Sequence, residues 1–153
     1  MSGRQTVAQA GQALARAAVA LVGTPFRLHG RDPATGLDCV GVLGAALAGC
    51  GRAAAVPTGY ALRLKDPAPW LAGAGALGLR QTRGAVRPGD VVMLALGSHQ
   101  HHLAIIAPDG AAIHAHAGLR RVVHGDLPAD WTVIGRWRLR ASPAATQDLS
   151  WQP

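Results

Sequence analysis

The sequence predicts an α+β domain in which N-terminal helices pack on a five- or six-stranded antiparallel sheet. Apolar residues recur at three- and four-residue steps early in the chain, which is the spacing of a helix face. Short apolar runs separated by Gly, Asp and Pro turns follow residue 90 and predict strands. Helices followed by neighbouring strands are typical of an α+β fold, with the helices on one face of the sheet.

Two helices are predicted before residue 52. The first covers 6–22, with Thr6 as its cap. A surface loop follows, because the segment TPFRLHGRDPATG carries two prolines and two glycines. The loop delivers Asp38 and Cys39 to the start of the second helix, which Asp38 caps and which ends at Gly49.

Strands are predicted in the second half of the chain. The middle segment, 52–87, contains turn signals and one short helix around 70–77. Pro108-Asp109-Gly110 predicts a hairpin turn between two of the strands. Arg136, Arg138 and Arg140 alternate and are expected on the solvated face of the last strand. The five predicted strands are 91–96, 102–107, 111–116, 120–124 and 132–140.

One domain is expected, over residues 1–140. The chain has 153 residues, of which 49% are hydrophobic, and this is enough for a single core. Residues 141–153 have no packing pattern and predict a flexible tail. The two cysteines are outside any CxxC pair, so no structural cross-link is expected.

The N-terminal segment predicts neither secretion nor membrane insertion. Arg16 interrupts its apolar residues, and no run approaches the roughly 18 apolar residues that span a bilayer. Synthesis in the cytoplasm without a signal peptide is therefore expected.

The charge of the chain favours acidic partners. Fifteen Lys and Arg against eight Asp and Glu give a net charge of +7, which suits nucleic acid, anionic lipid or an anionic wall polymer. The arginines are scattered and aromatic residues make up only 4% of the chain, so specific binding of single-stranded nucleic acid is not expected.

Cys39 and two histidines form the candidate site. A thiol attacks as thiolate, and a helix N-terminus or a neighbouring imidazole lowers its pKa from about 8.5. The hairpin places His102 and His114 on adjacent strands, where they are cross-strand neighbours or lie close to that arrangement. One imidazole can then take the thiol proton while the other fixes its tautomer and orientation.

Other readings of these residues stay open. A lone cysteine before a small-residue helix is also typical of a packed core. A histidine in an apolar strand is likewise typical of a structural role. The HQHH cluster with His114 and His116 could hold zinc or copper, although no carboxylate lies among them, so no metal cofactor is expected. His101 replaces His102 as the base if the strand register shifts by one residue.

Several segments together resemble the NlpC family of papain-like bacterial cell-wall peptidases. They are a Gly-x-Pro-aromatic loop ending at Phe26, an Asp-Cys-x-Gly helix start, a Gly-Asp before a strand, a His opening the next strand, and a second His in an IHA strand. They occur in the family's order and span most of the chain, roughly residues 21–139.

The resemblance implies a papain-like NlpC fold and a cofactor-free cysteine peptidase. Cys39 is then the nucleophile, His102 the general base and acid, and His114 the orienting third residue. The implied reaction is hydrolysis of an amide in a peptidoglycan stem peptide, typically the γ-D-glutamyl to diamino-acid bond. The residues implied to contact the substrate are Phe26, His29, Asp38 and Val40.

The family often has Tyr at the place of Phe26 and Ser at the place of Val40, so two hydroxyl groups are replaced. Within the family, the apolar x in DCxG and the segment LPADWTVIGRWRL look like wall peptidases of phage tails and of phage-like gene transfer agents. This placement implies phage-like tail proteins as partners and association with the virion or tail. A structural tail component with the same fold but without catalysis is the alternative.

Overall fold

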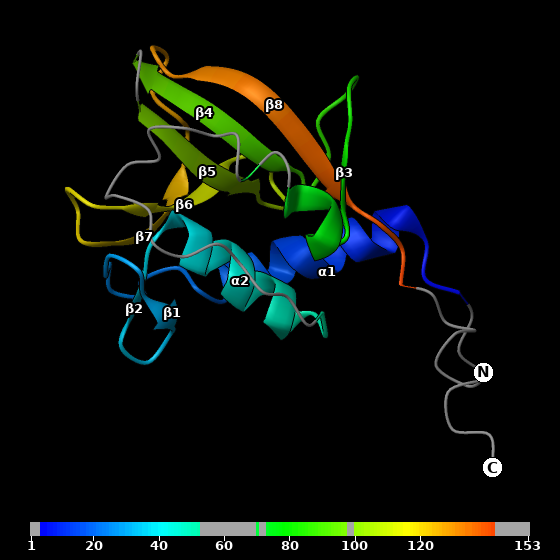
Figure 1. Ribbon diagram of the computed structural model, residues 1–153, viewed down its shortest axis with the longest axis horizontal. Helices are drawn as coiled ribbons and strands as arrows, with labels where there is room; N and C mark the ends of the chain where they lie inside the picture. The colour runs from blue at the N-terminus through cyan, green and yellow to red at the C-terminus, as the bar shows by residue number, and fades with distance from the viewer. Residues whose placement is uncertain (1–3, 53–69, 71–72, 98–99, 143–153) are drawn as a thin grey trace.

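An antiparallel sheet of six strands forms the centre of the computed structural model, which describes residues 4–52, 70, 73–97 and 100–142 (Figure 1). The strand order is β3-β8-β4-β5-β6-β7, so the last strand returns to pair with both β3 and β4. The strands are β3 Leu79–Gln81, β4 Val91–Gly97, β5 Gln100–Ile106, β6 Ala112–His116, β7 Arg121–Gly125 and β8 Thr132–Leu139. A separate two-stranded sheet joins β1 Arg31–Asp32 to β2 Gly36–Leu37.

Two α-helices, α1 Val7–Val19 and α2 Cys39–Gly49, pack against each other on one side of the sheet (Figure 1). α1 begins at a capping box, in which Thr6 accepts from the N–H of Gln9 and the Gln9 side chain accepts from the N–H of Thr6. α2 has no polar face, and its buried residues pack against α1, β5 and β6. A short 3-10 helix, Ala74–Leu77, precedes β3.

The sheet separates two apolar clusters, as strand alternation requires. On the inner face Leu103, Ile105 and Ile113 pack with the two helices. On the outer face lies a smaller cluster, against which side chains from the chain between β7 and β8 pack. Its members are Val92, Leu94, Ala104, Ile106 and Ala112, with Leu96, Leu127 and Trp131 against them.

The predicted fold class is confirmed, and so is the hairpin between β5 and β6. Asp109 accepts from the N–H of Ala111 through its side chain, and Gly110 has a positive φ of 88°, which a tight turn favours. The prediction of a helix around 70–77 lies partly outside the described residues. The predicted tail, 141–153, also lies outside them except for residues 141 and 142, and Ser142 donates its N–H to Gln5.

Three short strands escaped prediction because too few residues show a pattern. β1 and β2 have two residues each, and β3 has three with one buried. They matter for the site, because β1 and β2 hold the loop that precedes α2.

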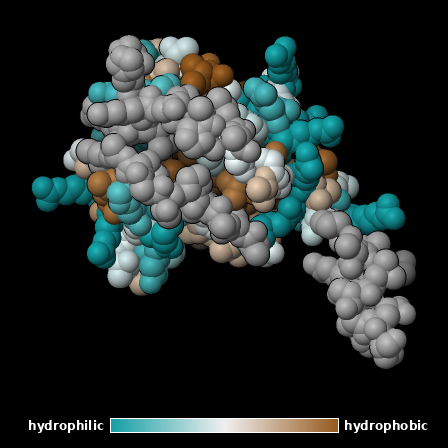
Figure 2. Space-filling view, viewed as in Figure 1, coloured by the Kyte–Doolittle hydropathy of each residue, from teal (hydrophilic) through white to brown (hydrophobic). Residues whose placement is uncertain are grey.

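On the face shown in Figure 2, hydrophilic side chains project around the edge, and the apolar areas of the described residues are small and separated. No helix among the residues with a described position is long and apolar enough to cross a membrane.

The expectation that Arg136, Arg138 and Arg140 all lie on a solvated face was wrong. Arg136 and Arg138 are half-buried and share the fully buried carboxylate of Asp90, at 2.9 and 2.8 Å, while Arg140 is exposed. Burial raises the pKa of Asp90, but hydrogen bonds from Arg138, the N–H of Arg87 and Arg136 outweigh it and leave this pKa below its ordinary value.

We expect Asp90→Asn to lower the free energy of unfolding by about 3–5 kcal/mol at pH 7, because two half-buried guanidinium groups lose their anion. The lowered pKa of Asp90 means that its contribution is present above the unfolded-state pKa of about 3.9 and is lost as the pH falls through the folded-state value. Urea denaturation at several pH values measures both effects. Asp109→Asn is the matched control, because Asp109 pairs with His124 at the exposed surface. An equal, small effect of both variants would contradict the structural role of Asp90.

Candidate active site

The Asp38 side chain organises the start of α2. Its Oδ1 accepts from the N–H of Gly41 at 2.8 Å, which caps the helix, and its Oδ2 accepts from the N–H of His29 at 2.8 Å. Arg31 donates to Oδ1 at 3.1 Å. Because Asp38 is only 2% exposed, these charge-assisted bonds fix the loop before α2 to the helix terminus.

Gly41 explains the glycine of the Asp-Cys-x-Gly pattern. A Cβ at this position would collide with the carbonyl oxygen of Gly30, so the loop and the first turn of α2 approach as closely as backbones can. The cap at Asp38 and the contact at Gly41 act together. They place Cys39 as the first helical residue with little freedom to move.

The pairing of β5 with β6 stops near the candidate site. These strands pair only at Ile105–Ile113 and Ile106–Ala112, whereas β4 pairs with β5 along most of its length. Ile106 exchanges hydrogen bonds with Gly89 and Asp90, just before β4. Residues of β5 at odd spacing from Ile106, such as Leu103, therefore turn their N–H groups towards β6. Where the pairing has ended, the N–H of Leu103 faces the Cys39 thiol instead and acts to lower its pKa.

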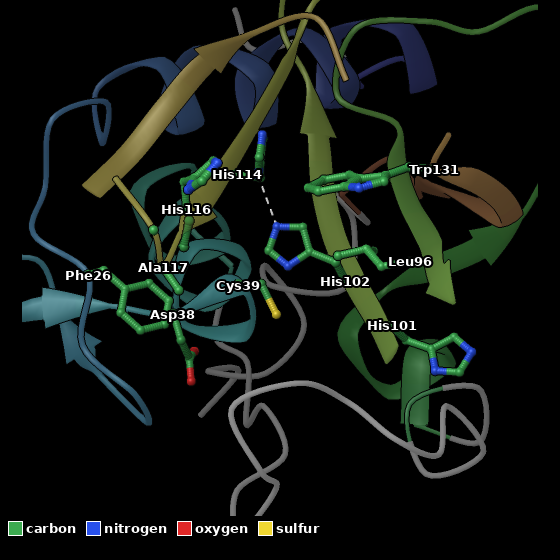
Figure 3. Close-up of a pocket in the computed structure, with 12 residues that line it drawn as sticks. Phe26, Asp38, Cys39, Leu96, His101, His102, His114, His116, Ala117 and Trp131 are labelled. Atoms are coloured by element: carbon green, nitrogen blue, oxygen red, sulfur yellow. Dashed lines mark hydrogen bonds between the residues drawn. The ribbon is translucent and has the colours of Figure 1, made fainter. Parts of the chain in front are cut away.

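This gap lets a residue of the inner face meet residues of the outer face. α2 packs on the inner face, but His102 and His114 lie two residues from Ala104 and Ala112 and share their outer face. Cys39, His102 and His114 nevertheless line one cavity of about 120 Å³ (Figure 3). The thiol is 8% exposed. The cavity is also lined by Phe26, Asp38, Leu96, His101, Ala115, His116, Ala117, Gly118 and Trp131.

The two histidines are hydrogen-bonded, with 3.0 Å between His102 Nε2 and His114 Nδ1 and an interplanar angle of 85°. The register of β5 and β6 makes them diagonal rather than directly opposed neighbours, a separation that aromatic rings can span. If His102 is to accept a proton at Nδ1, its Nε2 must carry hydrogen and donate to His114 Nδ1. Figure 3 shows Cys39 on the side of His102 that faces away from His114.

Burial keeps the resting groups neutral. It raises the pKa of the Cys39 thiol to about 12, with the charge of Asp38 acting in the same direction and the N–H groups of Leu103, Val40 and Cys39 opposing it. Burial is the main cause that lowers the pKa of His102 to about 3, and the charges of His114 and His116 act in the same direction. Burial and His116 lower the pKa of His114 to about 4.

The expectation that the helix N-terminus and an imidazole lower the pKa of this thiol was therefore wrong for the resting chain. The desolvation of a nearly enclosed sulfur outweighs the backbone N–H groups that face it. Among the described residues, no hydrogen bond joins Cys39 Sγ to His102. Such contacts tighten in many enzymes only when substrate binds.

The other predicted substrate contacts divide into two pairs. Phe26 and Asp38 line the cavity. Val40 is 1% exposed in the main core and His29 is exposed, and neither lines the cavity. His101 also lines the cavity. In the observed strand register, however, it is His102 and not His101 that contacts His114.

Trp131 is a cavity residue that the sequence did not single out. Its ring centroid lies 5.7 Å from those of both His102 and His114, with an interplanar angle of 72° to each. Its position in LPADW, between two strands, gave no periodic signal. The feature of the sequence that could have indicated Trp131 as a cavity residue was a tryptophan within a polar loop.

The described residues offer no cluster of side chains for a metal ion. The described part of the chain contains no group of three or more His, Cys, Asp or Glu side chains placed to hold an ion, and His99 lies outside that part. Cys39 and Cys50 are both free thiols.

Solved structures with the same architecture identify the fold. NlpC2 from Trichomonas vaginalis superposes with a TM-score of 0.62 at 18% identity, over 93% of this chain and 49% of that one. The fold is that of the NlpC/P60 proteins. The peptidoglycan hydrolase RipB from Mycobacterium tuberculosis gives a TM-score of 0.57 at 19% identity, over 89% of this chain and 67% of that one.

The NlpC/P60 domain of the peptidoglycan hydrolase SagA gives a TM-score of 0.53 at 26% identity, over 76% of this chain and 88% of the domain. The chain spans less than half the length of the first three matching structures. No protein-family model and no curated protein matches the sequence.

We expect iodoacetamide to react with Cys39 more slowly than with free cysteine at pH 7–8, because burial raises the pKa of this thiol to about 12. The rate should still be rising at pH 9–10, where free cysteine levels off. Comparison with Cys39→Ala isolates the reaction of Cys39 from that of Cys50. A plateau below pH 7 at a rate above that of free cysteine would instead indicate a preformed thiolate and imidazolium pair.

Proposed function

We propose that this protein is a cysteine peptidase that hydrolyses an amide bond in peptidoglycan stem peptides. The observation that carries the proposal is the hydrogen-bonded pair of His102 and His114 beside the Cys39 thiol in one small cavity. The NlpC/P60 fold supports it, since RipB and SagA are described as peptidoglycan hydrolases.

In the first step His102 acts as a general base. The thiol proton moves to His102 Nδ1 as Cys39 Sγ forms a bond to the carbonyl carbon of the substrate. The resulting imidazolium donates through Nε2 to His114 Nδ1, which lies 3.0 Å away. The N–H groups of Leu103, Val40 and Cys39 face the sulfur and stabilise the negative charge on it while the proton leaves.

In the second step the imidazolium becomes a general acid. His102 returns the proton to the leaving nitrogen, the C–N bond breaks, and a thioester on Cys39 remains. Water then attacks this thioester with His102 again as base, which releases the carboxylic acid and the thiol. A neutral resting pair fits this route, because charge separation occurs only when the carbonyl is in place.

The bond cleaved is proposed to be the γ-D-glutamyl to diamino-acid bond, from the resemblance of the Asp-Cys-x-Gly and IHA segments. The net charge of +7 supports an anionic polymer as substrate. Delivery to the wall as a component of a phage-like tail rests on the LPADWTVIGRWRL segment and remains part of the proposal.

We expect Cys39→Ala to lower the release of peptides from purified peptidoglycan by at least ~10³-fold, as loss of a nucleophile does in comparable enzymes. Cys50→Ala is the matched control and should keep full activity, because this half-buried thiol donates to the carbonyl of Leu47 at the end of α2. Mass spectrometry of the soluble peptides measures the activity and identifies the bond.

His102→Gln should lose about as much activity as Cys39→Ala, and the double variant little more, because the two groups act in one step. His114→Gln should lose less activity, because His102 is still present as the base but is no longer held in its orientation. Equal peptide release by wild type and Cys39→Ala would refute the proposal.

A further inference from the structure

We propose that Trp131 is a positioning residue of this site, which holds His102 and His114 in their mutual orientation and shields them from water. The inference rests on the proposed function of the two histidines. It assigns a role to the LPADW segment that the triad alone leaves unexplained.

Among the described residues, neither α1 nor α2 packs on the outer face of the sheet, where the histidines lie. α1 and α2 lie on the inner face, and the outer cluster is covered by Leu127 and Trp131 from the chain between β7 and β8. A turn fixes this segment, since the N–H of Trp131 donates to the carbonyl of Pro128 at 3.1 Å. Trp131 therefore covers the outer face of the sheet beside His102 and His114.

The indole contacts both imidazoles with the same geometry. The centroid distance is 5.7 Å and the interplanar angle 72° for His102 and for His114 alike, which is a tilted edge-to-face arrangement. In Figure 3 the indole lies on one side of the His102 ring and Cys39 on the other. Rotation of the His102 ring away from the thiol would thus drive it into the indole.

Removal of the indole has two separable consequences. The imidazoles gain freedom to rotate, which misaligns the base and lowers kcat more than it changes KM. They also gain water, which favours the charged form of a buried base. The pKa of His102, which burial holds at about 3, should then rise towards the ordinary value of 6.5.

The groups that face His102 from the surrounding elements stay unchanged in this comparison. Within the described part of the chain they are His101 on β5, His114 and His116 on β6, and Asp38 and Cys39 at the N-terminus of α2. A change in the pH profile can therefore be assigned to the loss of the indole.

The test compares Trp131→Ala, Trp131→Phe and the control Leu127→Ala, which removes a neighbouring side chain of the same outer cluster. We expect kcat to fall about 10- to 100-fold in Trp131→Ala with KM changed less than threefold. The loss should be greater at pH 5.5 than at pH 8, because a raised pKa leaves more His102 protonated. Trp131→Phe should recover most of the activity, and Leu127→Ala should show no such pH dependence.

A readout without catalysis separates this inference from the proposed function. The Cε1–H resonances of His102 and His114, followed by NMR against pH in the full chain, report their titration even if no peptide is cleaved. An upward shift of the His102 titration by a unit or more in Trp131→Ala, reversed in part in Trp131→Phe, supports the inference. If Trp131→Ala fails to fold, a smaller upward shift in Trp131→Phe serves the same purpose. Unchanged titration, with kcat reduced no more than in Leu127→Ala, overturns it.

Discussion

The early end of the β5–β6 pairing is the constraint on which the site depends. α2 and the two histidines lie on opposite faces of the sheet, and a continuous ladder would keep them apart. Because pairing stops at Ile105, the N–H of Leu103 is available to Cys39, and the first turn of α2 reaches the outer-face histidines. Asp38 and Gly41 fix that turn from the other side, so the position of the thiol is determined by backbone contacts.

Burial decides the chemistry of the resting site. A thiol with a pKa near 12 and an imidazole with a pKa near 3 form a neutral pair over a wide range of pH. The pair becomes reactive as the proton moves from the sulfur to His102, when the three backbone N–H groups that face the sulfur and the bond to His114 stabilise the separated charges. The enclosed thiol is also protected from oxidation, since susceptibility follows thiolate character and exposure.

The sequence predicted those parts of the fold that carry periodic patterns or strong local signals. These parts are α2 from Cys39 to Gly49, the turn at Pro108 to Gly110, and the approach of His102 to His114. It could not predict the return of β8 to the centre of the sheet or the end of the β5–β6 pairing, because both depend on tertiary packing. It missed Trp131 and the neutral thiol for a related reason, because burial among residues distant in the sequence leaves no local signal.

The central claim is that Cys39 carries the acyl group of the cleaved peptide. Hydroxylamine competes with water for a thioester, so its addition during digestion of purified peptidoglycan peptides tests this claim directly. The account predicts hydroxamate products, together with an acid-quenched adduct that peptide mapping places on Cys39. Turnover that yields neither a hydroxamate nor an adduct on Cys39 at any quench time would contradict it.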